Sequence, residues 1–274
     1  RDSPKAGLNY DINQKNKIYF SLSKAHREPT RSDFENNINI QPEELIDYEL
    51  GWKYNAEKFF FNSNLYYMGY KNQLVLTGAL DDVGSPIREN SGKSYRTGIE
   101  IESVYKATNK LNISANISLS ENKNVDYKTN YNGVITDWGD TDISFSPNVI
   151  SSAGIQFSAS QDLTFTLLNK FVGNQYMSNT ESNISKLSSY STTDLNILYT
   201  IENSALWMFG SAYFSEIIVT AMINNIFNKE YVSNGYYYTY DDTWSDPNLI
   251  TTIEGTGYYP QAKRNFLIGL TFKL

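Results

Sequence analysis

The chain has 274 residues, of which 40% are apolar and 19% charged, so it is not a disordered segment of low hydrophobicity and high charge. It has no cysteine and one histidine, His26, which excludes disulfide scaffolds, thiolate zinc sites and multi-histidine metal centres. The net charge of −7 argues against a nucleic-acid partner, because phosphate binding needs a basic face.

Alternation of apolar and polar residues with period two is the strongest signal along the chain, because it places every second side chain on one face of a strand. Residues 111–119 show it most clearly, with five apolar residues separated by four polar ones. In chain order, the pattern predicts about eleven strands. They cover 4–12, 16–26, 43–55, 58–72, 93–107, 110–122, 144–159, 162–176, 188–201, 215–226 and 260–274.

The connections between these strands alternate between short polar turns and long links. Short turns are expected at 13–16, 55–58, 107–110 and 160–162, and long links at 27–42, 73–92, 123–143, 177–187 and 227–259. Because short and long connections alternate, residues 202–214 should form a short turn, but this segment is too long and too apolar for one. The sequence predicts an antiparallel meander whose connections are short at one end and long at the other.

These features favour a transmembrane antiparallel β-barrel over a soluble β-sandwich. The predicted strands are long enough to cross a bilayer at a tilt, and short turns on one side with long loops on the other are the arrangement of outer-membrane barrels. Tyrosine and tryptophan also gather near strand ends, where aromatic girdles meet the two membrane interfaces. The residues in question are Trp52, Tyr54, Tyr66, Tyr67, Tyr70, Tyr95 and Tyr105.

Four motifs in this order resemble the C-terminal half of the barrel of a TonB-dependent outer-membrane receptor, of the kind common in Bacteroidetes. Residues 19–33 resemble a mid-barrel strand and its turn, and residues 44–51 the next strand. Residues 224–231 are similar to the penultimate strand, and residues 260–272 to the closing strand with its assembly signal. The chain departs from the family in ending at Leu274, where the family most often has phenylalanine.

The resemblance implies a barrel of 22 strands filled by an N-terminal plug, of which residues 1–274 would supply the C-terminal part of the barrel. The plug, the N-terminal strands and any signal peptide would then lie outside this chain. The implied location is the outer membrane, and the implied function is import of a scarce nutrient, such as a ferric siderophore, haem, cobalamin or a glycan. The implied partners are the plug and the other barrel half, an energy-coupling TonB complex acting through the plug, and membrane lipid. A surface lipoprotein is a further candidate partner.

Two loops hold aromatic residues that could grip a ligand, because such rings offer rigid, amphipathic surface. Alternatively, they continue strands above the membrane as part of a girdle. The candidates are Tyr236, Tyr237, Tyr238, Tyr240 and Trp244 in one loop, and Tyr131 and Trp138 in another. A separate polar set, Arg96, Glu100 and Glu102, should face the lumen and the plug.

The sequence shows no convincing catalytic or metal site, and we expect neither an enzyme nor a cofactor. His26 is the only histidine that could act as a base. Adjacent carboxylates such as Asp241 and Asp242 point to opposite faces of an extended chain. The acidic spacing of residues 137–142 does not match an EF-hand.

Two alternatives remain at this point. One is a soluble, aromatic-rich β-sandwich or adhesin-like module that binds carbohydrate. The other is a small closed outer-membrane pore of about ten or twelve strands, since such barrels have even strand numbers. A closed pore would have to pair the strand at 4–12 with the strand at 260–274.

Overall fold

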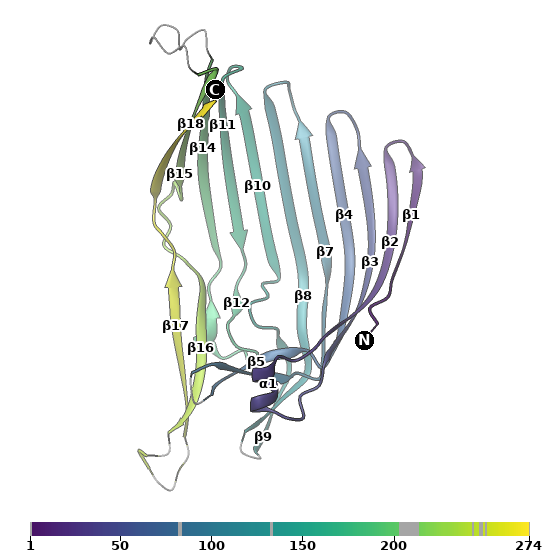
Figure 1. The fold of residues 1–274 in the computed structure, drawn as a ribbon, viewed down its shortest axis with the longest axis vertical. Coiled ribbons are helices and arrows are strands. Elements are labelled where there is room, and N and C mark those ends of the chain that lie inside the picture. Colours follow the sequence, from purple (N-terminus) through teal and green to yellow (C-terminus); the bar gives the residue numbers. More distant parts are fainter. Residues whose placement is uncertain are drawn as a thin grey trace.

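The computed structural model describes residues 2–81, 84–131, 134–202, 214–242, 244–246, 249 and 251–273. Most of these residues lie in one curved antiparallel sheet (Figure 1). Residues 203–213, where the sequence placed a turn that was too long, lie outside the described residues. Within the described residues, no helix is long and apolar enough to cross a membrane.

The main sheet contains the eleven predicted strands in chain order, and each pairs antiparallel with the next. β9 (Val134–Asp142) also joins this sheet by pairing with β8. The predicted all-β antiparallel fold is therefore confirmed. The eleven strands are β1 (Lys5–Asn13), β2 (Asn16–Arg27), β3 (Glu43–Asn55), β4 (Phe59–Lys71), β7 (Lys93–Lys106), β8 (Leu111–Tyr131), β10 (Val149–Ser158), β11 (Leu163–Val172), β14 (Tyr190–Glu202), β15 (Glu216–Asn224) and β18 (Asn265–Lys273).

The predicted long links contain more regular structure than the sequence indicated. β8 continues nine residues beyond its predicted end at residue 122, because its added part pairs with β9. β10 begins later than predicted, after Pro147, which has no N–H for a ladder. The elements inside the links are α1 (Arg31–Asn36), β5 (Leu74–Leu80), β6 (Pro86–Asn90), β12 (Gln175–Tyr176), η1 (Asn183–Ser185), β13 (Lys186–Leu187), β16 (Val232–Asp242) and β17 (Thr251–Pro260).

Short turns lie at one end of the sheet and the long links at the other, as predicted (Figure 1). The first turn shows how the short ones close. The side chain of Asn13 accepts hydrogen bonds from the backbone N–H groups of Lys15 and Asn16. An asparagine that bonds its own following backbone in this way favours a tight reversal.

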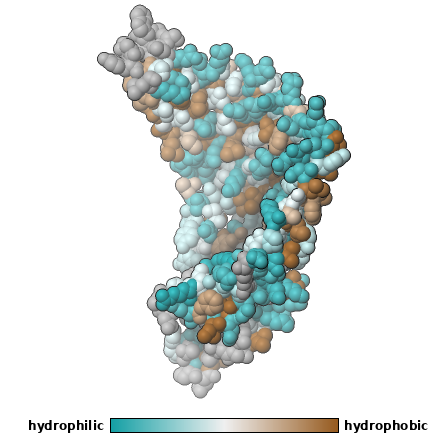
Figure 2. All heavy atoms as spheres, turned by 45° about the vertical axis from the view of Figure 1, so that its right-hand side comes forward, coloured by the Kyte–Doolittle hydropathy of each residue, from teal (hydrophilic) through white to brown (hydrophobic). Residues whose placement is uncertain are grey.

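The two faces of the sheet differ in polarity along whole rows of neighbouring strands. One face carries an apolar row across six strands, in which each residue lies beside the next: Ile113, Ile155, Leu167, Leu195, Ile223 and Phe266. The opposite face carries the row Glu102, Asn116, Ser152, Lys170 and Thr192. We call these the apolar face and the polar face. Figure 2 shows hydrophobic residues along the right-hand border of the hollowed molecule.

The apolar face is uncovered. Ile155 is 46% exposed and Phe266 is 67% exposed. The buried hydrophobic side chains lie instead at the loop end: Ile40, Leu74, Val75, Tyr127, Ile143, Val172, Met177 and Leu187. A soluble sandwich would bury its aliphatic rows between two sheets, so that alternative is wrong. The small closed pore is wrong as well, because within the described residues β1 and β18 are opposite edges of the main sheet and do not pair.

Two rows of aromatic rings cross the apolar face. On the loop side, the ring of Tyr67 lies 6.5 Å from that of Tyr48 and 6.2 Å from that of Tyr95. On the turn side, the ring of Phe59 lies 6.4 Å from that of Tyr105. Tyr95 and Tyr105 are ten residues apart on β7, or roughly 25 Å along the normal for a strand tilted by about 40°. This is the height of the apolar band of an outer-membrane barrel.

Two tyrosines that the sequence placed near these rows lie on the polar face. Tyr66 lines a polar hollow with Glu49 and Asn64, and its hydroxyl lies over Gly98 on the next strand. The Tyr70 hydroxyl donates to the Met68 sulfur at 3.8 Å, and Met68 pairs in register with Arg96 of the polar face. The interface assignment of these two residues is wrong, because adjacent residues of a strand point to opposite faces and Tyr67 occupies the apolar one.

Candidate functional site

The long links join into one structure, here called the loop cluster, which comprises the described parts of residues 72–92, 123–148, 174–189 and 225–262. β16 pairs in parallel with β5 at Thr239 and Ala79, which makes a second sheet of order β17, β16, β5, β6. Segments more than a hundred residues apart in sequence are therefore held together by backbone hydrogen bonds.

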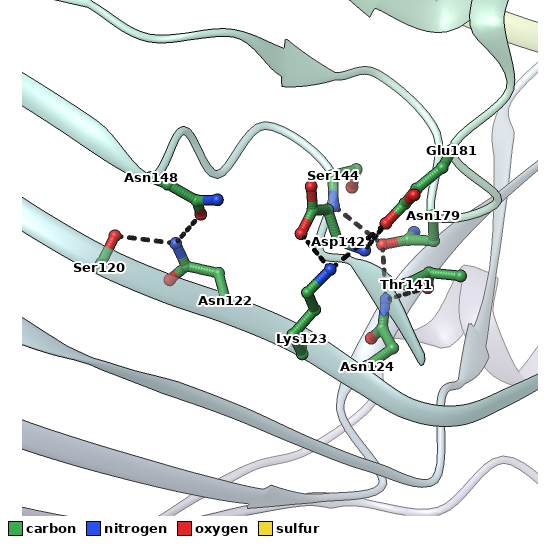
Figure 3. A network of polar contacts seen from close by, with 10 residues as sticks. All are labelled: Ser120, Asn122, Lys123, Asn124, Thr141, Asp142, Ser144, Asn148, Asn179 and Glu181. Carbon is green, nitrogen blue, oxygen red and sulfur yellow. Dashed lines mark hydrogen bonds and ion pairs between the residues drawn. The ribbon is translucent and has the colours of Figure 1, made fainter. Parts of the chain in front are cut away.

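Asn179 is the centre of a buried polar network (Figure 3). Its side-chain oxygen accepts hydrogen bonds from the Ser144 N–H at 2.9 Å and the Asn124 amide at 3.3 Å. Its amide nitrogen donates to the Leu76 carbonyl at 2.9 Å. Asn124 and Asn179 are 0% and 1% exposed, respectively, so water cannot replace these bonds without opening the loops. This one side chain fastens three links to one another.

A charged group lies beside this network. The Lys123 ammonium is 2.7 Å from an oxygen of Asp142 and 3.6 Å from an oxygen of Glu181. Partial burial by itself would lower the pKa of Lys123, but the hydrogen bond to Asp142 and the charges of both carboxylates outweigh it and raise that pKa. Lys123 therefore stays protonated and ties β8 to β9 and to the link before β14.

A second buried pair joins β6 to β8. The Tyr127 hydroxyl donates to the Glu89 carboxylate at 2.9 Å, and Tyr127 is 1% exposed. Burial raises the pKa of Glu89, although the hydrogen bond from Tyr127 acts in the opposite direction. Burial and the neighbouring carboxylate likewise raise the pKa of Tyr127, so its hydroxyl stays protonated.

The pair predicts a pH dependence of the loop cluster. The pKa of Glu89 is raised in the folded state, so protonated Glu89 stabilises the loop cluster. This stabilisation is complete below the pKa of an unfolded glutamate, about 4.3, and is lost as the pH rises through the raised pKa of folded Glu89. Hydrogen exchange of residues 86–90 and 123–131, corrected for its intrinsic pH dependence, should accelerate over that interval. Glu89→Gln keeps an acceptor for Tyr127 and should remove the dependence. An unchanged dependence in that variant would assign it to other groups.

The β16–β17 hairpin has an inner face that packs on the other parts of the loop cluster. The Tyr237 hydroxyl donates to one oxygen of Glu254 at 2.6 Å, and the Ser182 hydroxyl donates to the other at 2.9 Å. The Tyr258 hydroxyl donates to the Ile184 carbonyl at 2.9 Å. Tyr237 is therefore an internal contact of the hairpin, which sets it apart from its neighbours in the run of tyrosines.

The other face of the hairpin carries a ladder of parallel rings, here called the aromatic ladder. Neighbouring rings are 6.2 to 6.5 Å apart with interplanar angles of 14° to 27°. Tyr236 and Tyr238 lie flat over Gly257 and Gly255 of β17, where a β-carbon would be about 2 Å from the rings. Tyr236, Tyr240 and Trp244 are 50%, 45% and 74% exposed, whereas Tyr238 is half-buried. The ladder consists of Tyr236, Tyr238, Tyr240 and Trp244.

A cavity of about 470 Å³ lies between this hairpin, β5 and the link after β11. Its lining is mostly apolar and aromatic, has no charged side chain, and includes Leu76, Phe145, Met177, Ser178 and Tyr237. A cavity of this size can hold a small organic group.

The other predicted site residues lie elsewhere. The side chain of Tyr131 lies outside the described residues. Trp138 is on β9, 42% exposed, and donates to the Thr129 hydroxyl at 3.0 Å. Within the described residues, no ring contact links Trp138 to the aromatic ladder.

The polar set predicted for the lumen lies on the polar face. Arg96 donates to Ser146 at 2.8 Å and to Asn122 at 3.2 Å. Glu100 lines the hollow that also contains Arg96. Glu102 pairs in register with Asn62 and Asn116.

Sequence reasoning missed Asn124, Asn179 and Glu181. The alternation of β8 stops after Leu119, because residues 120–124 are all polar, so the sequence carried no sign that the strand extends into the link. Nothing local distinguishes Asn179, whose partners come from two other links. Among the described residues, no group of three or more histidine, aspartate or glutamate side chains could hold a metal ion, and His26 contacts Glu44 at 3.3 Å.

The sequence matches a protein-family model described as "TonB dependent receptor-like, beta-barrel" over residues 1–226. No curated protein sequence matches the chain. Among solved structures, the copper transporter OprC has a TM-score of 0.70 at 16% identity, covering 98% of this chain and 39% of that one. The siderophore receptor PiuA from Acinetobacter baumannii has a TM-score of 0.69 at 17% identity, covering 98% and 35%. The ferric-catecholate import receptor Fiu from E. coli K12 has a TM-score of 0.66 at 15% identity, covering 97% and 34%. The chain spans less than two fifths of the length of each, and the likeness at these identities is one of fold.

Proposed function

Since this chain belongs to the TonB-dependent receptor-like β-barrel family, we propose that it forms part of the wall of an outer-membrane transporter that imports a scarce nutrient. The observation that carries the proposal is the uncovered apolar face, bounded by two aromatic rows about one membrane thickness apart. The loop cluster then lies outside the cell, and the short turns lie in the periplasm.

The open edges of the sheet support a larger barrel. In lipid, the unpaired backbone groups of β1 and β18 would each cost several kcal/mol, so both edges need partner strands. We assign these partners to the other half of a barrel of about 22 strands, and a lumen of that width needs a plug. Arg96, Glu100 and Glu102 would then face the plug, through which a TonB complex supplies energy.

The nutrient belongs to the group of ferric siderophores, haem, cobalamin and glycans. The three structural neighbours are named for copper, a siderophore and a ferric catecholate, which puts metal-bearing compounds first for testing. A surface lipoprotein that covers the mouth is a further candidate partner.

A deletion strain tests this proposal. The complete receptor, tagged and returned on a plasmid, should fractionate with the outer membrane and restore growth on one limiting iron, cobalamin or sugar source. Removal of the TonB protein should abolish the same growth. Recovery of the tagged receptor in the soluble fraction, or normal growth of the deletion strain on every source, would count against transport.

We further propose that the aromatic ladder contacts the imported ligand. Tyr238→Ala and Tyr240→Ala should each weaken ligand binding by about three- to tenfold, because one stacked ring contributes about 0.5–1.5 kcal/mol. Tyr199→Ala is a matched control, since Tyr199 is as exposed as Tyr240 but lies on β14. Calorimetry with the nutrient identified by growth provides the measurement. Equal affinities for ladder and control variants would leave the ladder as part of a girdle.

A further inference from the structure

A groove of about 560 Å³ lies on the apolar face at the loop end of the sheet, across β3, β4 and β7. It begins at the loop-side tyrosine row and continues toward the long links. Here we call it the lysine groove. Its lining includes Glu44, Ile46, Tyr67, Gly69, Lys71 and Lys93.

The strand register explains the shape of this groove. Gly69 lies between Ile46 on β3 and Tyr95 on β7, on the face that carries the apolar rows. Because Gly69 has no side chain, its larger neighbours leave a hollow with an apolar floor. Lys71 and Lys93 lie directly opposite one another at the loop end of that hollow.

The charges around the groove are not balanced. Like charges directly opposite on neighbouring strands are destabilising, and both lysines are exposed in a chain of net charge −7. No carboxylate in the described part of the chain forms an ion pair with Lys71 or Lys93. Glu44 lies opposite Lys71 in register, but its carboxylate contacts the Lys24 ammonium at 2.9 Å and His26 at 3.3 Å. An anion between the two lysines would remove the repulsion.

We propose that the lysine groove binds an anionic, phosphate-bearing lipid of the outer leaflet. The phosphate lies between Lys71 and Lys93, and the beginning of one acyl chain lies on the apolar floor. The inference rests on the proposed membrane location, which puts the row of Tyr48, Tyr67 and Tyr95 at the headgroup level. Lysine stems lie along apolar surface while their ammonium groups reach the headgroups, where anionic lipid attracts them.

Native mass spectrometry of the complete receptor in detergent tests this inference, with diphosphoryl lipid A as the probe. The double variant Lys71→Gln/Lys93→Gln should bind the probe about 30-fold more weakly than the unchanged receptor, from two lost lysine contacts. The control Lys15→Gln/Lys58→Gln removes the same charge from exposed turns at the other end of the sheet and should bind normally. Lys71→Arg/Lys93→Arg keeps the charge and should retain binding.

Equal binding by the Gln variant and the control overturns the proposal, as does full competition by inorganic phosphate, which would indicate a free-anion site. Heat-dependent migration on a gel shows that each variant is folded, and the Arg variant separates loss of charge from loss of structure. Outer-membrane fractionation of the unchanged receptor reports on the proposed function separately. Failure of lipid binding in a correctly located receptor overturns only the lysine groove.

Discussion

Replacing Ile117 by lysine should destabilise the complete receptor by about 2–4 kcal/mol, because it places a charge on the lipid side of the barrel near the midplane. Ile117 lies beside Ile101 of β7, which is between the two aromatic residues of that strand, Tyr95 and Tyr105. A urea titration of folding into lipid vesicles measures the difference. Ser118→Lys is the matched control at the same depth.

Ser118 faces the polar side, opposite Glu100 in register, so a lysine there gains a carboxylate neighbour and should cost little. Equal losses at Ile117 and Ser118 would contradict the assignment of the two faces. Ile113→Lys should cost only about 0–1 kcal/mol, because the charge penalty falls near the interfaces. Ile113 lies beside Tyr105 in the turn-side aromatic row. The alternation of apolar and polar residues alone does not show that Ile113 and Ile117 lie at different depths in the membrane.

Replacing Asn179 by alanine should lower the free energy of opening the loop cluster by about 3 kcal/mol, since each buried polar group left without a partner costs about 1–3 kcal/mol. The Ser144 N–H and the Leu76 carbonyl lose the partners that Asn179 provides. Hydrogen exchange of residues 74–77 and 141–144 should accelerate about 100-fold. The main sheet should exchange as before, because its ladders do not depend on the loop cluster.

Asn183→Ala is the control for this change. Asn183 belongs to the same link and is exposed, so its side chain should contribute little to stability. Exchange at the rates of the unchanged receptor in the Asn179 variant would mean that the loop cluster is held mainly by its apolar contacts. Ligand binding by the aromatic ladder should weaken in the Asn179 variant if the hairpin depends on this support.

The strands of the main sheet and the faces of their side chains were predictable from sequence. The alternation in 111–119 or 266–274 is a local property, and side-chain direction follows directly from it. Strand ends were less predictable where the alternation stops but the strand continues, as in the all-polar residues 120–124, because there pairing with β9 decides how far the strand extends. Tyr66 and Tyr70 show a similar limit. Their place near a strand end indicated the membrane interface, but their even positions in the alternation put them on the polar face.

The candidate site was decided by tertiary structure. A run of tyrosines at 236–240 predicts exposed rings, but which of them turn outward depends on Glu254 and Ser182, which bond Tyr237, and on the glycines of β17 under the others. Asn179 lies 103 residues from Leu76 in sequence, and neither neighbourhood carries a sign of the other. The sequence by itself determined an antiparallel sheet with one apolar and one polar face, because the alternation that defines the two faces is a relation between neighbouring residues. Only the tertiary structure determined the loop cluster and the lysine groove. Their residues are distant in the sequence, and no repeating pattern along the chain shows which of them meet.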